Sequence, residues 1–234
     1  MPRAAPTTCC LAALALTAGV AIADSEYHAA GWREDFRTQP AGWEIRRKPG
    51  AKLAEFHIEA ATDGHDGALA MTANGQSGMF ATKLERVDLR RTPILRWRWR
   101  ATVLPTGGDG RVDDRDDQAI AIYVSAGGLL RQKSIAYRWE TDTPVGTQGD
   151  STYAAGIVKT KWFAVRNAQD KGSFFVEERN VVRDFQRAFG FVPDEVNIGV
   201  TCNSQYTGTT AVAELDWIEL VAESPTPGAE PEVP

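Results

Sequence analysis

The sequence has few of the residues that most metal sites and nucleophile-dependent enzymes use. It contains three histidines and three cysteines, and the GxSxG, HExxH and P-loop patterns do not occur. A histidine-based zinc site is therefore not expected. Two of the cysteines, Cys9 and Cys10, lie in the N-terminal segment. Without that segment only Cys202 remains, which excludes an internal disulfide and favours a small buried residue over a reactive thiol.

Long hydrophobic runs are also scarce. Residues 1–23 carry Arg3, no acidic residue, and a short apolar run that ends in Ala21-Ile22-Ala23. This pattern is typical of an export signal, so we expect cleavage after Ala23 and a periplasmic or secreted protein. No later run of about 18 apolar residues exists, and no membrane span is expected after cleavage.

The sequence also has fewer basic than acidic residues. Without residues 1–23 the chain has 25 basic and 31 acidic residues, a net charge of −6 with histidine neutral. Nucleic-acid binding relies on basic patches, so no nucleic-acid partner is expected. The Pro-rich acidic tail, residues 224–234, is predicted to be disordered. Residues 24–223 then form a single domain that is long enough for one hydrophobic core.

The chain does contain a series of short runs in which apolar and polar residues alternate. They lie at 68–73, 93–103, 118–125, 134–140, 156–167, 195–201 and 211–222. Runs of this length predict an all-β fold, an antiparallel β-sandwich or jelly roll. One short helix is predicted near 178–190, because Val181, Phe185 and Phe189 recur at four-residue steps and Gly190 can end it.

The clearest run is LRWRWRA, residues 95–101. On a strand its apolar and arginine side chains point to opposite faces. If it adjoins the strands at 118–125 and 134–140, Trp97 and Trp99 belong to the core, and the alternative is an exposed platform for a sugar. The opposite face then carries a candidate ligand-binding set, which is Arg98, Asp116, Asp117, Tyr123, Arg138 and Glu140. Arginines there suit carboxylates or sulfates, while the alternative is a solvated face whose ion pairs contribute only about 0–1 kcal/mol each.

Aspartates suggest a metal site. Five of them crowd GGDGRVDDRDDQA, residues 107–119, and oxygen ligands at short spacing suit Ca²⁺. The spacing is not that of an EF-hand, and the alternative is a solvated acidic loop. A second site could join the first and last strands of a jelly roll. The candidate metal ligands are Asp35, Asp113, Asp114 and Asp216.

Several segments together resemble a bacterial domain of unknown function, family 3047. They are the W-x-W strand at 95–101, the double Asp before the strand ending in Tyr123-Val124, SIAYRW, and EERNVVRDFQRAFG. The resemblance implies an exported β-rich domain with recurring polar residues at Asp116, Asp117, Arg179, Asn180 and Asp184, and no established activity. TCNSQYTG departs from the family's Asp/Asn-rich turn, which argues against a metal at that turn. Glu178, Arg179, Asn180 and Asp184 are interpreted as structural polar residues that fasten the helix to the sheet.

Three functions stay open from the sequence. The first is a binding module for a glycan or another cell-envelope ligand. The second is a glycoside hydrolase or polysaccharide lyase that acts on an acidic polysaccharide, although no spacing selects a carboxylate pair. The third is a non-catalytic structural protein of the envelope.

Overall fold

The computed structural model describes residues 31–62, 65–85, 87–128, 131–153 and 156–224. The expected signal, residues 1–23, and residues 225–234 of the expected tail lie outside these ranges. Within them, no helix has the length and hydropathy of a membrane span.

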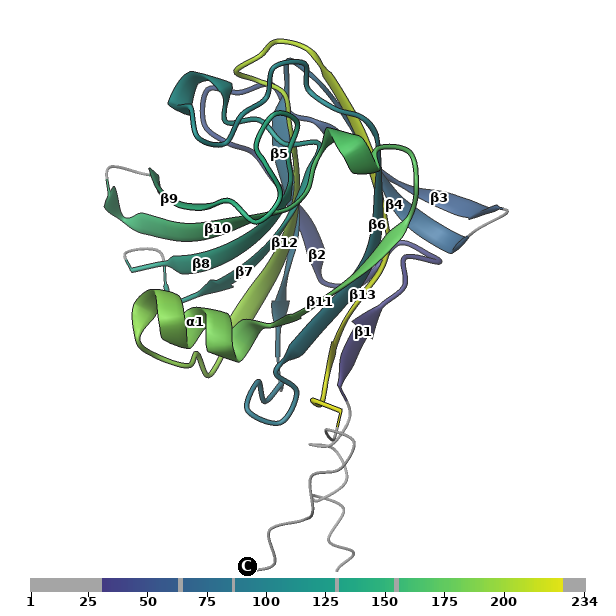
Figure 1. Ribbon diagram of the computed structural model, residues 1–234. Coiled ribbons are helices and arrows are strands. Elements are labelled where there is room, and N and C mark those ends of the chain that lie inside the picture. The colour runs from purple at the N-terminus through teal and green to yellow at the C-terminus, as the bar shows by residue number, and fades with distance from the viewer. Residues whose placement is uncertain (1–30, 63–64, 86, 129–130, 154–155, 225–234) are drawn as a thin grey trace, which may run out of the picture.

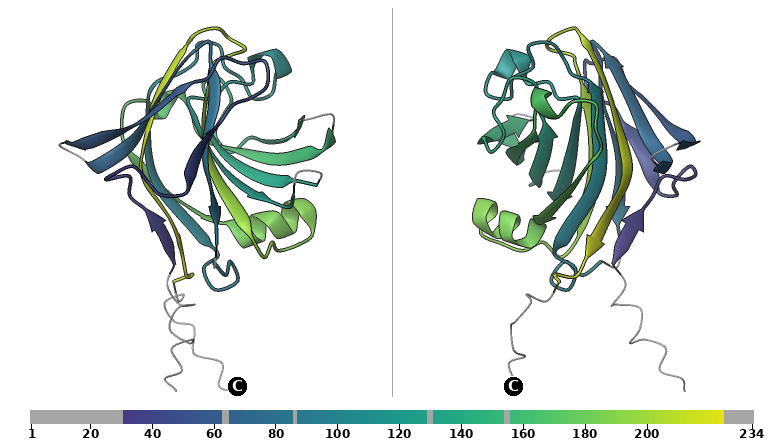
Figure 2. Two further views of the ribbon diagram at one scale, coloured as in Figure 1. Left: turned by 180° about the vertical axis from the view of Figure 1, so that it is seen from behind. Right: turned by 45° about the vertical axis from the view of Figure 1, so that its right-hand side comes forward.

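Two β-sheets face each other in a sandwich (Figures 1 and 2). Sheet A has the spatial order β11 (Phe175–Asn180), β6 (Ile94–Val103), β13 (Thr210–Val221), β4 (His65–Asn74) and β3 (Glu55–Thr62), with β1 (Trp32–Glu34) paired to β13. Sheet B has the order β2 (Trp43–Arg46), β5 (Ser77–Leu84), β12 (Val196–Asn203), β7 (Ile120–Ala126), β8 (Lys133–Trp139), β10 (Val158–Arg166) and β9 (Gln148–Tyr153). The predicted all-β sandwich of jelly-roll type is confirmed.

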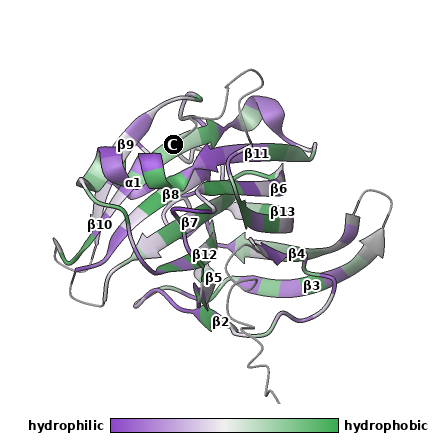
Figure 3. Ribbon diagram, turned by 90° about the horizontal axis from the view of Figure 1, so that it is seen from below, coloured by the Kyte–Doolittle hydropathy of each residue, from purple (hydrophilic) through white to green (hydrophobic). Residues whose placement is uncertain are grey.

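Each of the seven predicted runs is a strand, because the alternation gives every strand one apolar face for the core (Figure 3). The strand pairs within the two sheets are antiparallel except β8 and β10, which run parallel. Strands β1, β2, β3, β5, β9 and β11 were not among the seven predicted runs. They are short, or they are interrupted by glycine and charged residues, so their alternation is weak in the sequence.

The predicted helix is confirmed as α1 (Val181–Phe189), which packs against β8 and β6. Asn180 caps its N-terminus by accepting a hydrogen bond from the Arg183 backbone N–H at 2.9 Å. Gly190 ends the helix in the left-handed conformation, with φ of 77°. Glu178, Arg179 and Asn180 precede the helix and belong to β11.

Trp97 and Trp99 are fully buried. The prediction that they belong to the core is confirmed, and the alternative of an exposed platform for a sugar is wrong. Their rings meet the opposite sheet: Trp97 stacks on Tyr137 with centroids 5.2 Å apart, and Trp99 meets Trp139 edge-on at 5.4 Å. The assumption that 95–101 lies beside 118–125 and 134–140 in one sheet is wrong. β6 belongs to sheet A and faces β8 across the core, while β7 and β8 are neighbours in sheet B.

Candidate functional site

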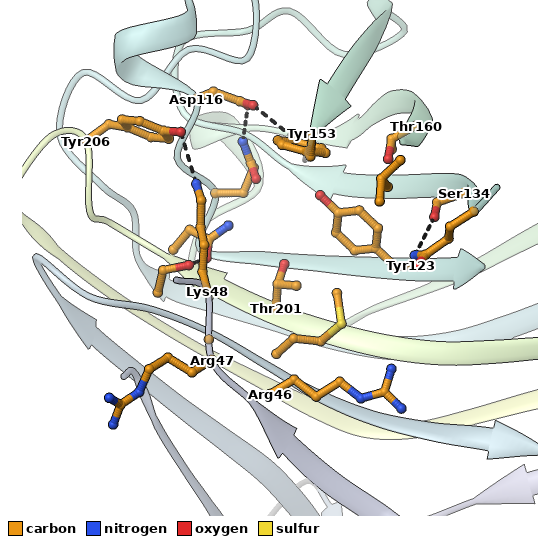
Figure 4. Close-up of a pocket in the computed structure, with 17 residues that line it drawn as sticks. Arg46, Arg47, Lys48, Asp116, Tyr123, Ser134, Tyr153, Thr160, Thr201 and Tyr206 are labelled. Carbon is orange, nitrogen blue, oxygen red and sulfur yellow. Dashed lines mark hydrogen bonds between the residues drawn. The ribbon is translucent and has the colours of Figure 1, made fainter. Parts of the chain in front are cut away.

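The outer face of sheet B carries a pocket of about 250 Å³, here called the sheet B groove (Figure 4). Ala121, Ala136 and Ala164 pack with Trp162 and Tyr123 in a small apolar cluster of this sheet, and of these five residues Tyr123 lines the groove. The groove is lined by Arg46, Arg47, Lys48, Ser77, Gly78, Met79, Asp116, Gln118, Tyr123, Gln132, Ser134, Tyr153, Val158, Thr160, Thr201, Asn203 and Tyr206.

Hydroxyl groups in this lining have hydrogen-bonding capacity to spare. Thr160 and Thr201 are buried, and their side-chain oxygens have no hydrogen-bond partner within the described ranges. Figure 4 shows both side chains at the groove, on opposite sides of Tyr123. Buried polar atoms are rarely left unpaired, because the unmade bond costs about 1–3 kcal/mol.

Asp116 is held at the rim by three donors. Its Oδ1 accepts from Arg138 Nη1 at 2.8 Å and from Gln118 Nε2 at 2.7 Å, and its Oδ2 accepts from the Tyr153 hydroxyl at 3.4 Å. Burial raises the pKa of Tyr153, so this phenol stays protonated and acts as a donor. The carboxylate of Asp116 is therefore fixed in place with its charge largely balanced.

Arg138 lies beneath Asp116 and is fully buried. Its guanidinium stacks on Trp162 at 4.8 Å and lies 3.7 Å from Glu140 Oε1. Glu140 is also fully buried and accepts from the Gly110 N–H at 3.0 Å and the Thr143 hydroxyl at 2.9 Å. Burial raises the pKa of Glu140, and the neighbouring Arg138 opposes that rise. Both residues support the groove from within rather than face a ligand directly.

Asp117 and Asp116 do not form a carboxylate pair. Asp117 is fully buried and accepts from the backbone N–H groups of Tyr206 at 2.9 Å and Thr207 at 2.7 Å. Burial raises its pKa, and these hydrogen bonds counteract the rise. Asp117 therefore holds the loop that brings Tyr206, 45% exposed, to the groove.

Arg98 is placed away from the groove. Because β6 lies in sheet A, its arginines point to the outer face of that sheet, where acidic residues of β13 meet them. Arg98 is ion-paired with Asp216, and Arg100 with Glu214 at 2.6 Å. Arg98 therefore does not share a face with Tyr123 and Arg138, because the assumed pairing of β6 with β7 and β8 is wrong. Tyr123 and Asp116 do line the groove.

The predicted metal ligands do not come together. No group of three or more His, Cys, Asp or Glu side chains lies close enough for a metal in the described part of the chain. The first and last strands do pair, β1 with β13, but Asp216 is bound to Arg98 and Asp35 to Arg37 at 3.2 Å. Asp113 and Asp114 lie exposed in a 3-10 turn. Calcium binding stays a prediction without an assembled ligand set.

The polar residues around α1 connect the helix to both sheets. The buried Tyr137 hydroxyl donates to Asp184 Oδ2 at 2.7 Å, and Arg179 Nε lies 3.5 Å from the same oxygen. Glu178 extends the outer-face network to Arg96 at 3.4 Å. Arg179 and Asp184 also line a second cavity of about 480 Å³ between α1 and the β9–β10 edge.

Several groove residues were not singled out from the sequence. Arg46 and Lys48 lie at and just after the end of β2, and Tyr153 lies on β9, two strands that were not predicted. Thr160 was within a predicted strand, but nothing local distinguishes an outward threonine over a pocket from one in solvent. The turn TCNSQYTG, noted for its departure from the family pattern, supplies Thr201, Asn203 and Tyr206.

Comparison with known proteins identifies the family. The model of DUF3047, described as a protein of unknown function, matches residues 41–219. The chain belongs to the DUF3047 family. No curated protein matches it in sequence.

Solved structures that are similar to this DUF3047 chain have low sequence identity to it and TM-scores below 0.5. The family 11 carbohydrate-binding module of cellulosomal cellulase Lic26A-Cel5E of Clostridium thermocellum is 8% identical with a TM-score of 0.45, over 83% of this chain and 96% of that one. The CBM22-1 xylan-binding domain from Paenibacillus barcinonensis Xyn10C is 14% identical with a TM-score of 0.38, over 84% and 98%. A cellulase derived from Cel12A of Rhodothermus marinus is 10% identical with a TM-score of 0.44, over 81% and 96%. Similarity at this level concerns the fold alone.

Proposed function

We propose that this protein binds a glycan in the sheet B groove. The observation that carries the proposal is the chemistry of the lining. Three tyrosines, Tyr123, Tyr153 and Tyr206, stand among side-chain amides and hydroxyls, and the hydroxyls of Thr160 and Thr201 are buried without a partner in the described structure. Sugars present apolar ring faces and many hydroxyls, so aromatic surfaces combined with convergent polar groups suit them.

The groove supports binding better than hydrolysis. A glycoside hydrolase of the common kind needs two carboxyl groups that flank the scissile bond. Asp116 is the one carboxylate among the described lining residues. It already accepts hydrogen bonds from Arg138, Gln118 and Tyr153. The raised pKa of Tyr153 also makes it a poor base for a lyase reaction near neutral pH.

Export to the periplasm or beyond is part of the proposal. The pattern of residues 1–23 supports it, because an exported chain would meet the glycans of the cell envelope. A purely structural role, in which polar side chains only support the sheet, agrees better with the arginine face of sheet A, where Arg96, Arg98 and Arg100 all have acidic partners.

The test is isothermal titration of the full chain with soluble neutral and acidic oligosaccharides. Tyr206→Ala should weaken the binding of a recognised oligosaccharide at least about fivefold, as expected for an exposed aromatic contact. Trp217→Ala is the matched control, because its ring lies under Arg33 in sheet A, away from the groove. Equal binding by the wild type and Tyr206→Ala, or no binding of any oligosaccharide, would overturn the proposal.

A further inference from the structure

We infer that the glycan bound in the sheet B groove is acidic and that Arg46, supported by Lys48, holds its carboxylate or sulfate group. This inference rests on the proposed function and specifies the class of ligand. It starts from the charges of the lining. Three cations, Arg46, Arg47 and Lys48, follow one another at the β2 edge, against the single carboxylate of Asp116.

The positive charge at this edge is not cancelled locally. Asp116 is paired with Arg138 at 2.8 Å, so it leaves the β2 cations without a lining carboxylate. Many arginines elsewhere on the protein have acidic partners, as with Arg33 and Glu219 at 2.8 Å or Arg90 and Asp194 at 2.9 Å. Arg46 has no carboxylate within ion-pair distance in the described structure. The whole chain has a net charge of −5, so the charge at this edge of the groove is opposite in sign to the net charge of the protein.

The geometry directs part of this charge toward the ligand. Arg46 lies opposite Met79 in the β2–β5 pairing, and Met79 packs against the small apolar cluster of sheet B. Lys48 Nζ donates to the Tyr206 hydroxyl at 3.0 Å and lies 4.6 Å from its ring centre. In Figure 4 Arg46 and Arg47 extend in opposite directions from the end of β2, while Lys48 reaches up to Tyr206.

The chemistry of these side chains selects an oxyanion. A guanidinium binds a carboxylate or sulfate through two parallel hydrogen bonds, which are stronger than neutral ones. The lysine that tethers Tyr206 supplies a second positive charge on the same side. A sugar ring near Tyr123 and Thr201 would then present its acidic substituent to Arg46. Polar groups farther along the groove, such as those of Gln132 and Ser134, would bind neutral hydroxyls of the chain.

The experiment compares two acidic probes with a neutral ester of one of them. The full chain is titrated with trigalacturonic acid, with its fully methyl-esterified form, and with a sulfated galactan trisaccharide, at low and at physiological salt. An acidic probe should bind at least tenfold more tightly than the ester, and salt should weaken the acidic probe alone. Arg46→Ala should remove that preference, and Arg46→Lys should restore part of it. Arg91→Ala is the matched control, because Arg91 is an exposed arginine that does not line the groove, and it should leave the affinity unchanged.

The outcomes separate this inference from the proposed function. If acid and ester bind equally, or if Arg46→Ala weakens both to the same extent, the groove binds neutral glycan and the inference is wrong. If no saccharide binds at all, the proposed function fails and the inference fails with it. Binding of the sulfated probe alone supports the inference and identifies sulfate as the anion.

Discussion

The buried Arg138 can be tested by replacing it with methionine, which keeps the length of the side chain and removes its charge. Arg138 connects Asp116, which is partly exposed at the rim, to Glu140, which is fully buried. Its removal leaves Glu140 as a buried carboxylate whose remaining donors are Gly110 and Thr143. Breaking one partner of a buried ion pair typically costs about 3–5 kcal/mol.

The cost should depend on pH in a definite direction. Burial raises the pKa of Glu140 in the folded protein, and Arg138 opposes that rise. A carboxyl group whose folded pKa is raised stabilises the fold below its unfolded pKa, and this contribution is lost as the pH rises through the folded value. Without Arg138 the pKa of Glu140 rises further. The destabilisation by Arg138→Met should therefore be small near pH 4 and reach its full value at pH 7.

The assay is urea unfolding followed by tryptophan fluorescence at pH 4 and pH 7, with thermal melts alongside. A loss of about 3–5 kcal/mol corresponds to a fall in Tm of roughly 6–20 °C for a domain of this size. The matched variant is Glu140→Gln, which keeps an acceptor for Gly110 and Thr143. Arg138→Met should cost much less in that background. A cost under about 1 kcal/mol at pH 7, or the same cost with and without Glu140, would refute the reasoning.

Two further predictions concern other buried groups. Tyr137→Phe removes the hydroxyl that donates to Asp184 at 2.7 Å and should lower the unfolding free energy by about 1–3 kcal/mol, measured in urea. An unchanged free energy would show that water or Arg179 replaces the bond. Cys202 is fully buried and burial raises the pKa of its thiol to about 12. In the chain without residues 1–23, where Cys202 is the one cysteine, Ellman's reagent should therefore react only in denaturant. Rapid reaction in the native protein would contradict this.

Alternation along β6 was enough to predict which side of that strand faces the core. Leu95, Trp97 and Trp99 had to point one way, and the arginines between them the other, whatever the partners of that strand. The helix could also be predicted from local signals, because the apolar spacing of 181–189 and the glycine at Gly190 specify it without reference to the sheets. The same local signals placed Asp116 at a strand boundary, where the structure finds it on the rim of the groove.

The sequence by itself therefore determined the all-β class, the inner and outer faces of β6, the helix, and the pattern of its N-terminal segment. Only the tertiary structure decided which sheet each strand joins, because alternation with a period of two is the same for every pairing partner. That decision placed Arg98 against Asp216 in sheet A and Tyr123 in the groove of sheet B. It also brought Arg46, Tyr153 and Tyr206 together from segments more than 50 residues apart, by long-range pairing that no local pattern encodes.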